Sequence, residues 1–248
     1  MRGNDQQAYD RGTSLFSPDG RIYQVEYARE AVSRGAPSVG IRTADGVVIA
    51  AQSRAGSSLM ESESIEKLHK IDDHVGAASA GHVADARQLV DFARRQGQVS
   101  QLRYGEPIDV EALTKELTDH IQENTQRGGT RPYGAALLVA GIENGEPRLF
   151  AADPSGTPNE WKATVIGGSG GDIQEFLEDE WDEEISHDDG LALAVRALRV
   201  ATDELGPSEV SIATLTDDEG YTSLSVDEIE DAFDDADIDL DDEDDGDA

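Results

Sequence analysis

The pair Gly12–Thr13 is the first place in the sequence where residue types and order could support catalysis. Cleavage after the glycine would free the amine of Thr13, which could then serve as the base for its own hydroxyl nucleophile. Thr13 is followed by Ser-Leu-Phe-Ser-Pro and a predicted turn, and it does not begin a buried strand near a lysine. We expect a structural segment here and no catalytic residue in the chain. An active N-terminal threonine peptidase using Thr13 is the alternative.

The run 167–171 (Gly-Gly-Ser-Gly-Gly) lies between a predicted strand and a predicted helix, where phosphate-binding loops occur. It lacks the Lys-Ser/Thr pair of such loops, and Asp172 at the start of the helix would repel a phosphate group. We therefore expect a close-packed turn between strand and helix.

The sequence does not indicate a metal site. There is no cysteine, and the five histidines lack the spacing of metal ligands. Asp235, Asp237 and Asp239 stand at the first three ligand positions of an EF-hand loop. Leu240, however, occupies the position that requires glycine, and Gly246 the position that requires glutamate. We expect no metal and no cofactor. The histidines are His69, His74, His82, His120 and His187.

The composition is strongly acidic. The chain of 248 residues has 53 Asp and Glu against 20 Lys and Arg, a net charge of −33, and only four of the cations are lysines. This charge argues against nucleic acids and anionic membranes as partners. An acidic, lysine-poor surface is typical of a protein that works in molar salt, where screening weakens self-repulsion. The most acidic segment, 227–248, is expected to be a short helix and a disordered tail.

Residues 1–12 are polar and lack the apolar core of a signal peptide. The longest nearly apolar run, 134–142, is far shorter than the roughly 18–20 residues that cross a bilayer. We therefore expect a cytoplasmic protein.

Hydrophobic periodicity and turn residues divide the chain into grouped strands and paired helices. Ile22, Val25 and Ala28 recur at helical spacing, and Gly35 is suited to end that helix. Asp45-Gly46 is typical of a hairpin turn. The predicted helices span 21–34, 84–103, 110–121, 172–181, 188–205 and 227–233, and the predicted strands span 38–43, 47–52, 68–71, 75–80, 135–142, 148–152, 162–166, 210–216 and 221–224.

This order argues against a doubly wound parallel sheet, because strands and helices do not alternate one by one. It favours an α+β fold in which two sets of strands are covered by pairs of helices. No repeat or linker divides the central part, so we expect one domain over 13–226.

A longer pattern is more specific than any of these motifs. The stretch 9–28, Tyr-Asp-Arg-Gly-Thr-Ser-Leu-Phe-Ser-Pro-Asp-Gly-Arg-Ile-Tyr-Gln-Val-Glu-Tyr-Ala, resembles the N-terminal signature of proteasome α subunits. The similarity continues through 64–67 (Ser-Ile-Glu-Lys), 81–87 (Gly-His-Val-Ala-Asp-Ala-Arg), 131–134 (Arg-Pro-Tyr-Gly) and 149–156. It covers residues 8–225. With the acidic composition, the chain is most similar to the α subunit of the archaeal 20S core particle of haloarchaeal type.

The resemblance implies a four-layer αββα sandwich of the N-terminal-nucleophile hydrolase type. It also implies a heptameric ring, homomeric or heteromeric, that stacks on β subunits carrying the catalytic threonines. The molecule itself would be a structural and gating part of a threonine-protease complex. Its expected partners are the other α subunits, the β subunits, a proteasome-activating AAA ATPase, and unfolded proteins in transit. A free-standing acidic binding protein is a third interpretation, which native mass spectrometry would separate from the others.

Gating is the mechanism that the resemblance implies. Residues 1–12 would form a mobile segment that converges with its copies on the pore and obstructs it. By similarity, Tyr9, Asp10, Pro18 and Tyr27 form the cluster that holds the open gate, with Arg11 nearby. Tyrosine hydroxyls and an aspartate can hydrogen-bond between neighbouring subunits, and the proline would stiffen the reverse turn over 17–20.

The resemblance also implies a pocket for the C-terminus of the activating ATPase. Lys67 matches the family's pocket lysine, and an ammonium fixed at a groove is a suitable receptor for a carboxylate. Gly35 and Gly81 would let the ligand backbone approach closely, and His82 would lie where the pocket is often apolar.

Overall fold

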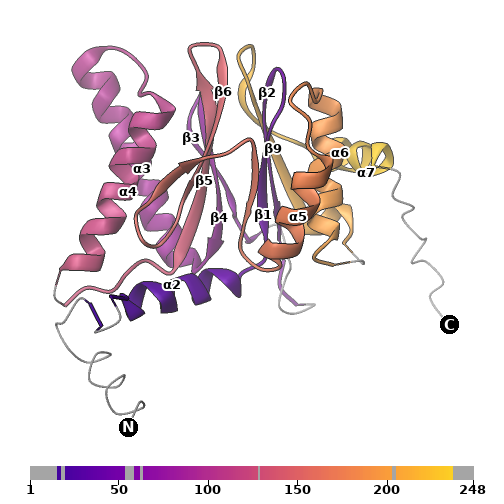
Figure 1. The fold of residues 1–248 in the computed structure, drawn as a ribbon. Coiled ribbons are helices and arrows are strands. Elements are labelled where there is room, and N and C mark those ends of the chain that lie inside the picture. Colours follow the sequence, from indigo (N-terminus) through magenta and orange to yellow (C-terminus); the bar gives the residue numbers. More distant parts are fainter. Residues whose placement is uncertain are drawn as a thin grey trace, which may run out of the picture.

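Two five-stranded antiparallel sheets stack face to face in the computed structural model, which describes residues 16–17, 20–53, 59–61, 64–127, 129–202 and 205–236 (Figure 1). One sheet has the order β10-β9-β2-β1-β8, and the other has the order β3-β4-β5-β6-β7. The strands of the first are β1 (Ser38–Arg42), β2 (Gly46–Gln52), β8 (Ala163–Ile166), β9 (Val210–Thr216) and β10 (Gly220–Ser223). Those of the second are β3 (Leu68–Asp72), β4 (Val75–Gly81), β5 (Ala135–Glu143), β6 (Glu146–Ala152) and β7 (Pro158–Glu160).

Helices cover the outer faces of both sheets and make four layers (Figure 1). The pair α3 (Val83–Tyr104) and α4 (Val110–Gln126) packs on β3 to β6, and the pair α5 (Gly170–Glu180) and α6 (His187–Arg199) packs on β8, β1 and β2. The last helix, α7 (Val226–Asp235), lies outside against α6. The fold is the predicted α+β sandwich of the N-terminal-nucleophile hydrolase type.

Strand β2 is buried on both of its faces, which explains the unbroken apolar run in its sequence. Val47 and Ile49 belong to the core between the two sheets, whereas Val48 and Ala50 belong to the core beneath α5 and α6. Since successive side chains of a strand point to opposite faces, a strand covered on both faces is apolar throughout. The predicted hairpin at Asp45-Gly46 is confirmed, with Arg42 opposite Val47.

Helix α2 (Tyr23–Ser33) runs across one end of the sandwich, next to β4 and β5 (Figure 1). It buries Val25, Ala28 and Val32, which repeat at intervals of three and four residues. It is therefore an amphipathic helix that closes this end of the molecule, as the sequence predicted for residues 21–34.

One helix is shorter than predicted, and one strand was missed. The helix expected over 188–205 begins at His187 and ends at Arg199. The amides of Ala201 and Thr202 bond three residues back, to Leu198 and Arg199, which tightens the chain into a turn. The short strand β7 pairs with β6 but is exposed throughout, so no hydrophobic pattern marked it.

Candidate functional site

Three backbone segments meet directly beyond the end of α2, and glycines make this possible. A Cβ atom on Gly35 would lie 2.7 Å from the nitrogen of Gly81, and one on Gly81 would lie 2.3 Å from the carbonyl oxygen of Gly134. Gly81 also has a φ of +100°, which other residues rarely adopt. The N–H of Gly168 donates to the carbonyl of Gly35 at 2.7 Å. The adjoining ends of β4, β5 and β8 thus converge on this turn.

Lys67, directly before β3, is buried and reaches the same turn. Its Nζ donates to the carbonyl oxygens of Ala36 at 2.7 Å, Pro37 at 3.0 Å and Gln52 at 3.1 Å. The three N–H groups of the ammonium therefore have three acceptors. Burial lowers the pKa of Lys67 to about 7. Such a group can attract a carboxylate when protonated and can accept a proton when neutral.

The four residues predicted for the activator pocket lie around this turn. Gly35 belongs to the turn, Gly81 packs against it, and Lys67 bonds to the next residue along the chain. His82 follows Gly81 and exposes 61% of its side chain. Its ring lies over Gly134, where an added Cβ would be 2.9 Å from Nδ1 of the imidazole. The fold thus gathers these residues at one place, and their binding role stays a prediction.

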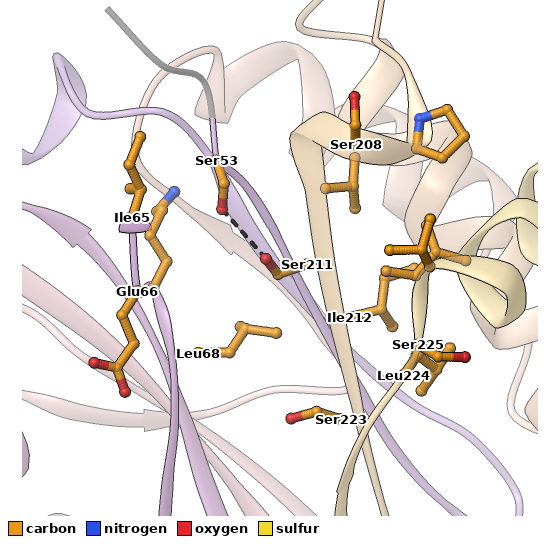
Figure 2. A pocket seen from close by; sticks show the side chains of 15 residues that line it. Ser53, Ile65, Glu66, Leu68, Ser208, Ser211, Ile212, Ser223, Leu224 and Ser225 are labelled. Carbon is orange, nitrogen blue, oxygen red and sulfur yellow. Dashed lines mark hydrogen bonds between the residues drawn. The ribbon is translucent and has the colours of Figure 1, made fainter. Parts of the chain in front are cut away.

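Lys67 also lines a groove of about 410 Å³ (Figure 2). Its walls come from the segment before β3, from β9, and from the start of α7. Figure 2 shows the hydroxyls of Ser53 and Ser211 facing each other, 3.3 Å apart. Apolar side chains such as Leu68 and Ile212 line the groove together with Glu66 and further serines. Gly35, Gly81 and His82 are not among the lining residues, so the predicted pocket and this groove share only Lys67.

Two residues beside His82 had no predicted role. Asp85 in the first turn of α3 is buried, and both of its carboxylate oxygens receive hydrogen bonds from Arg131 at 2.6 and 2.7 Å. The two residues are 46 positions apart. Each stands in a stretch that carries the family resemblance, but nothing in their local sequence indicates the contact.

Most of the predicted gate residues lie outside the described part of the chain: Tyr9, Asp10, Arg11 and Pro18, together with Thr13 of the alternative interpretation. The ends of the predicted turn over 17–20 are described. The N–H of Gly20 donates to the carbonyl of Ser17 at 2.9 Å, as a reverse turn requires. Tyr27 lies on α2 with 44% of its surface exposed.

The glycine-rich run and the histidines considered in the sequence analysis make contacts that belong to the fold. Residues 167–169 form the predicted close-packed turn, in which Gly168 bonds to Gly35, and α5 already begins at Gly170. Nε2 of His69 is 3.3 Å from the hydroxyl of Ser79, and Nε2 of His74 is 2.8 Å from the carbonyl of Ile108. Among the described residues, no three His, Cys, Asp or Glu side chains are grouped to hold a metal ion. In the same residues, no helix has both the length and the apolar character to cross a membrane.

Comparison with known proteins gives two family matches. Residues 32–215 match the family described as proteasome subunit, and residues 9–31 match the N-terminal signature of the A-type proteasome subunits. The second match covers the stretch that carries the resemblance most specifically.

Curated relatives match almost the whole chain. The proteasome alpha 2 subunit of Haloferax volcanii is 64% identical over 236 residues, which is 95% of this chain and 94% of the relative. The proteasome alpha subunit of Halobacterium salinarum is 62% identical over 238 residues, again 95% and 94%. The proteasome alpha 2 subunit of Haloarcula marismortui is 64% identical over 231 residues, or 92% and 95%. These organisms are haloarchaea, in agreement with the salt-adapted composition.

Proposed function

Because the chain belongs to the proteasome subunit family and is of its α type, we propose that it forms the outer heptameric rings of a cytoplasmic 20S particle and controls access to it. In this role it is a non-catalytic subunit, and the β subunits perform the proteolysis. Its N-terminal segment gates the pore, and its pocket receives the C-terminus of a regulatory ATPase that supplies unfolded proteins for ATP-dependent degradation.

The course of the chain into β1 supports the non-catalytic role. A nucleophile of the N-terminal type needs a free amine at the start of its strand. Here Ser38, the first residue of β1, follows Pro37 and α2 in an unbroken chain, so its amine is part of a peptide bond. The alternative, a peptidase using Thr13, requires cleavage after Gly12. Intact-mass measurement of the purified chain separates the two, since cleavage would remove residues 1–12.

The geometry of Lys67 is the observation that carries the docking proposal. Its ammonium is held by two carbonyls directly after α2 and by a third at the end of β2, close to Gly35 and, through Gly35, to Gly81. An incoming carboxylate would exchange one of these neutral acceptors for a charged one, and charge-assisted hydrogen bonds are the stronger kind. The chain has 20 Lys and Arg against 53 acidic residues, so a carboxylate meets mostly negative charge elsewhere on the chain.

The same contacts offer a route from docking to gating. Ala36 and Pro37, whose carbonyls bond to Lys67, follow α2 directly, and the other end of α2 continues toward the proposed gate segment. α2 also carries Tyr27, a member of the proposed gate cluster with Tyr9, Asp10, Arg11 and Pro18. A ligand that draws Lys67 away from these carbonyls would loosen the anchor of α2, and a shift of α2 would reach the gate.

Substitution of Lys67 tests the proposal in particles assembled from this chain and its β subunits. The readout is peptide hydrolysis with and without the activating ATPase, and with a peptide of the ATPase's last residues carrying a free carboxylate or an amide. Lys67→Ala should lower the apparent affinity for the free-carboxylate peptide by at least about tenfold, as expected for loss of a charged hydrogen bond.

Lys70→Ala is the matched control, because Lys70 lies three residues further along the chain, on β3, but is exposed and paired with Asp73 at 2.7 Å. This variant should respond as the wild type does. Undiminished stimulation of Lys67→Ala particles would contradict the docking proposal. Failure of this variant alone to assemble would assign Lys67 to the structure of the ring instead.

A further inference from the structure

The buried carboxylate of Asp85 accepts three hydrogen bonds next to the proposed pocket, two of them from the exposed side chain of Arg131. Its two oxygens accept from Nη1 and Nη2 of Arg131 at 2.6 and 2.7 Å, and Oδ2 also accepts from the N–H of Gly134 at 2.8 Å. Burial alone would raise the pKa of Asp85, but the bonds from Arg131 and Gly134 outweigh it and hold the pKa below its usual value. The carboxylate is therefore ionised, and each of its oxygens is bonded.

Through Gly134 this carboxylate supports the residues that border the pocket. The carbonyl of Gly134 accepts from the N–H of His82 at 2.8 Å, and Gly81 packs directly on the same carbonyl. The imidazole of His82 rests on Gly134, with Nδ1 4.0 Å from Oδ2 of Asp85. Gly134 thus contacts both Gly81 and His82, and Asp85 holds Gly134 in place together with the pairing of β4 and β5.

The loop over 131–134 is also fixed at a second point. The hydroxyl of Tyr133 is 3.1 Å from Nε2 of His120 on α4, and the ring of His120 stacks on Phe92 of α3 at 4.2 Å between centroids. The loop is held by α3 at Arg131 and Gly134 and by α4 at Tyr133. With Tyr133 held independently, loss of the Asp85 bonds would be felt first at Gly134, the residue beneath Gly81 and His82.

We propose that Asp85, paired with Arg131, is a positioning residue for the activator pocket: it holds Gly134 and thereby fixes Gly81 and His82 for a docked C-terminal carboxylate peptide. This inference rests on the proposed function of that pocket. Asp85 does not itself touch the ligand. Asp85 acts on the affinity for the peptide. Without it, Gly81 and His82 would be less ordered in the free protein, and the free energy needed to order them would oppose binding.

Asp85→Asn tests the proposal in assembled particles, because asparagine keeps the size of the side chain and removes its charge. The probe is the free-carboxylate peptide, titrated to give both the half-maximal concentration and the maximal stimulated rate. We expect the half-maximal concentration to rise about tenfold, because the loosened border must be ordered when the peptide binds, and the maximal rate to stay within about twofold. A residue needed only for folding would lower the yield of particles without changing this concentration.

Two further variants complete the test. Glu180→Gln removes another ion pair between elements, with Arg196 at 3.2 Å on the opposite face of the molecule, and should leave both values unchanged. Arg131→Lys keeps the charge but not the two-pronged contact, and should give an intermediate rise even if Asp85→Asn does not assemble.

An unchanged half-maximal concentration in Asp85→Asn or Arg131→Lys particles, with Lys67→Ala unresponsive, would overturn the positioning role and leave the pocket in place. If Lys67→Ala particles respond like the wild type, the docking function itself has failed, and the positioning role fails with it.

Discussion

The ammonium of Lys67 lies 2.7 Å from the carbonyl oxygen of Ala36, so a buried cation holds the chain at the point where α2 ends and the first sheet begins. The contact joins two segments that the sequence separates by 31 positions. Because Lys67 is also the proposed receptor for an activator's carboxylate, the same side chain serves as an anchor in the free molecule and as the proposed docking group.

Docking should weaken as the pH rises above neutrality. Burial lowers the pKa of Lys67 to about 7, so the free site loses its charge above that pH. A bound carboxylate favours the protonated form and raises this pKa, so binding above pH 7 takes up a proton. The half-maximal concentration of the free-carboxylate peptide should be constant below pH 7 and rise by up to about tenfold per pH unit above it. Peptide titrations from pH 6 to 9 at fixed salt concentration measure this dependence.

Lys67→Arg provides the control for that pH profile. A guanidinium stays protonated across the range, so this variant should bind with an affinity that does not change with pH, whatever its absolute value. A flat profile for the wild type, or an equal slope in the arginine variant, would show that some other group controls the pH dependence.

Deletion of residues 2–12 should raise peptide hydrolysis by the assembled particle in the absence of activator, because the proposed obstruction of the pore is removed. The activator should then add little. The measurement compares basal and activated rates of wild-type and shortened particles at equal particle concentration. Equal basal rates would contradict the gate, provided that electron microscopy shows intact rings.

Much of the fold could be predicted because its signals are local. An unbroken apolar run and the Asp45-Gly46 turn indicated β2 and its hairpin with β1, and the spacing of Val25, Ala28 and Val32 indicated α2. The end of α6 was misplaced because the residues after Arg199 remain compatible with a helix, and the hydrogen bonds of the folded chain decide where it stops.

The candidate site was predictable only in part. The resemblance singled out Lys67, Gly35 and Gly81, but the acceptors of the ammonium are main-chain carbonyls, which every residue has and no side-chain pattern marks. The pairing of Asp85 with Arg131 is equally hidden, because it depends on how the paired strands β4 and β5 bring the start of α3 next to the loop over 131–134.

Gly81→Ala should be far more damaging than an alanine at another glycine of similar backbone conformation. Gly81 has a φ of +100°, and Gly105, which ends α3, has a φ of +75°. Nothing lies within 4 Å of a Cβ on Gly105, so its replacement by alanine should lower the free energy of unfolding by about 1–2 kcal/mol through backbone strain alone. A Cβ on Gly81 would in addition lie 2.3 Å from the carbonyl of Gly134, a main-chain atom that cannot turn aside. Overpacking of this kind adds about 1–3 kcal/mol.

Thermal unfolding of the two variants at fixed salt and protein concentration gives the difference. Equal midpoints would mean that the turn beyond α2 can open at little cost, and the close approach of Gly35, Gly81 and Gly134 would then not be a rigid support for the pocket.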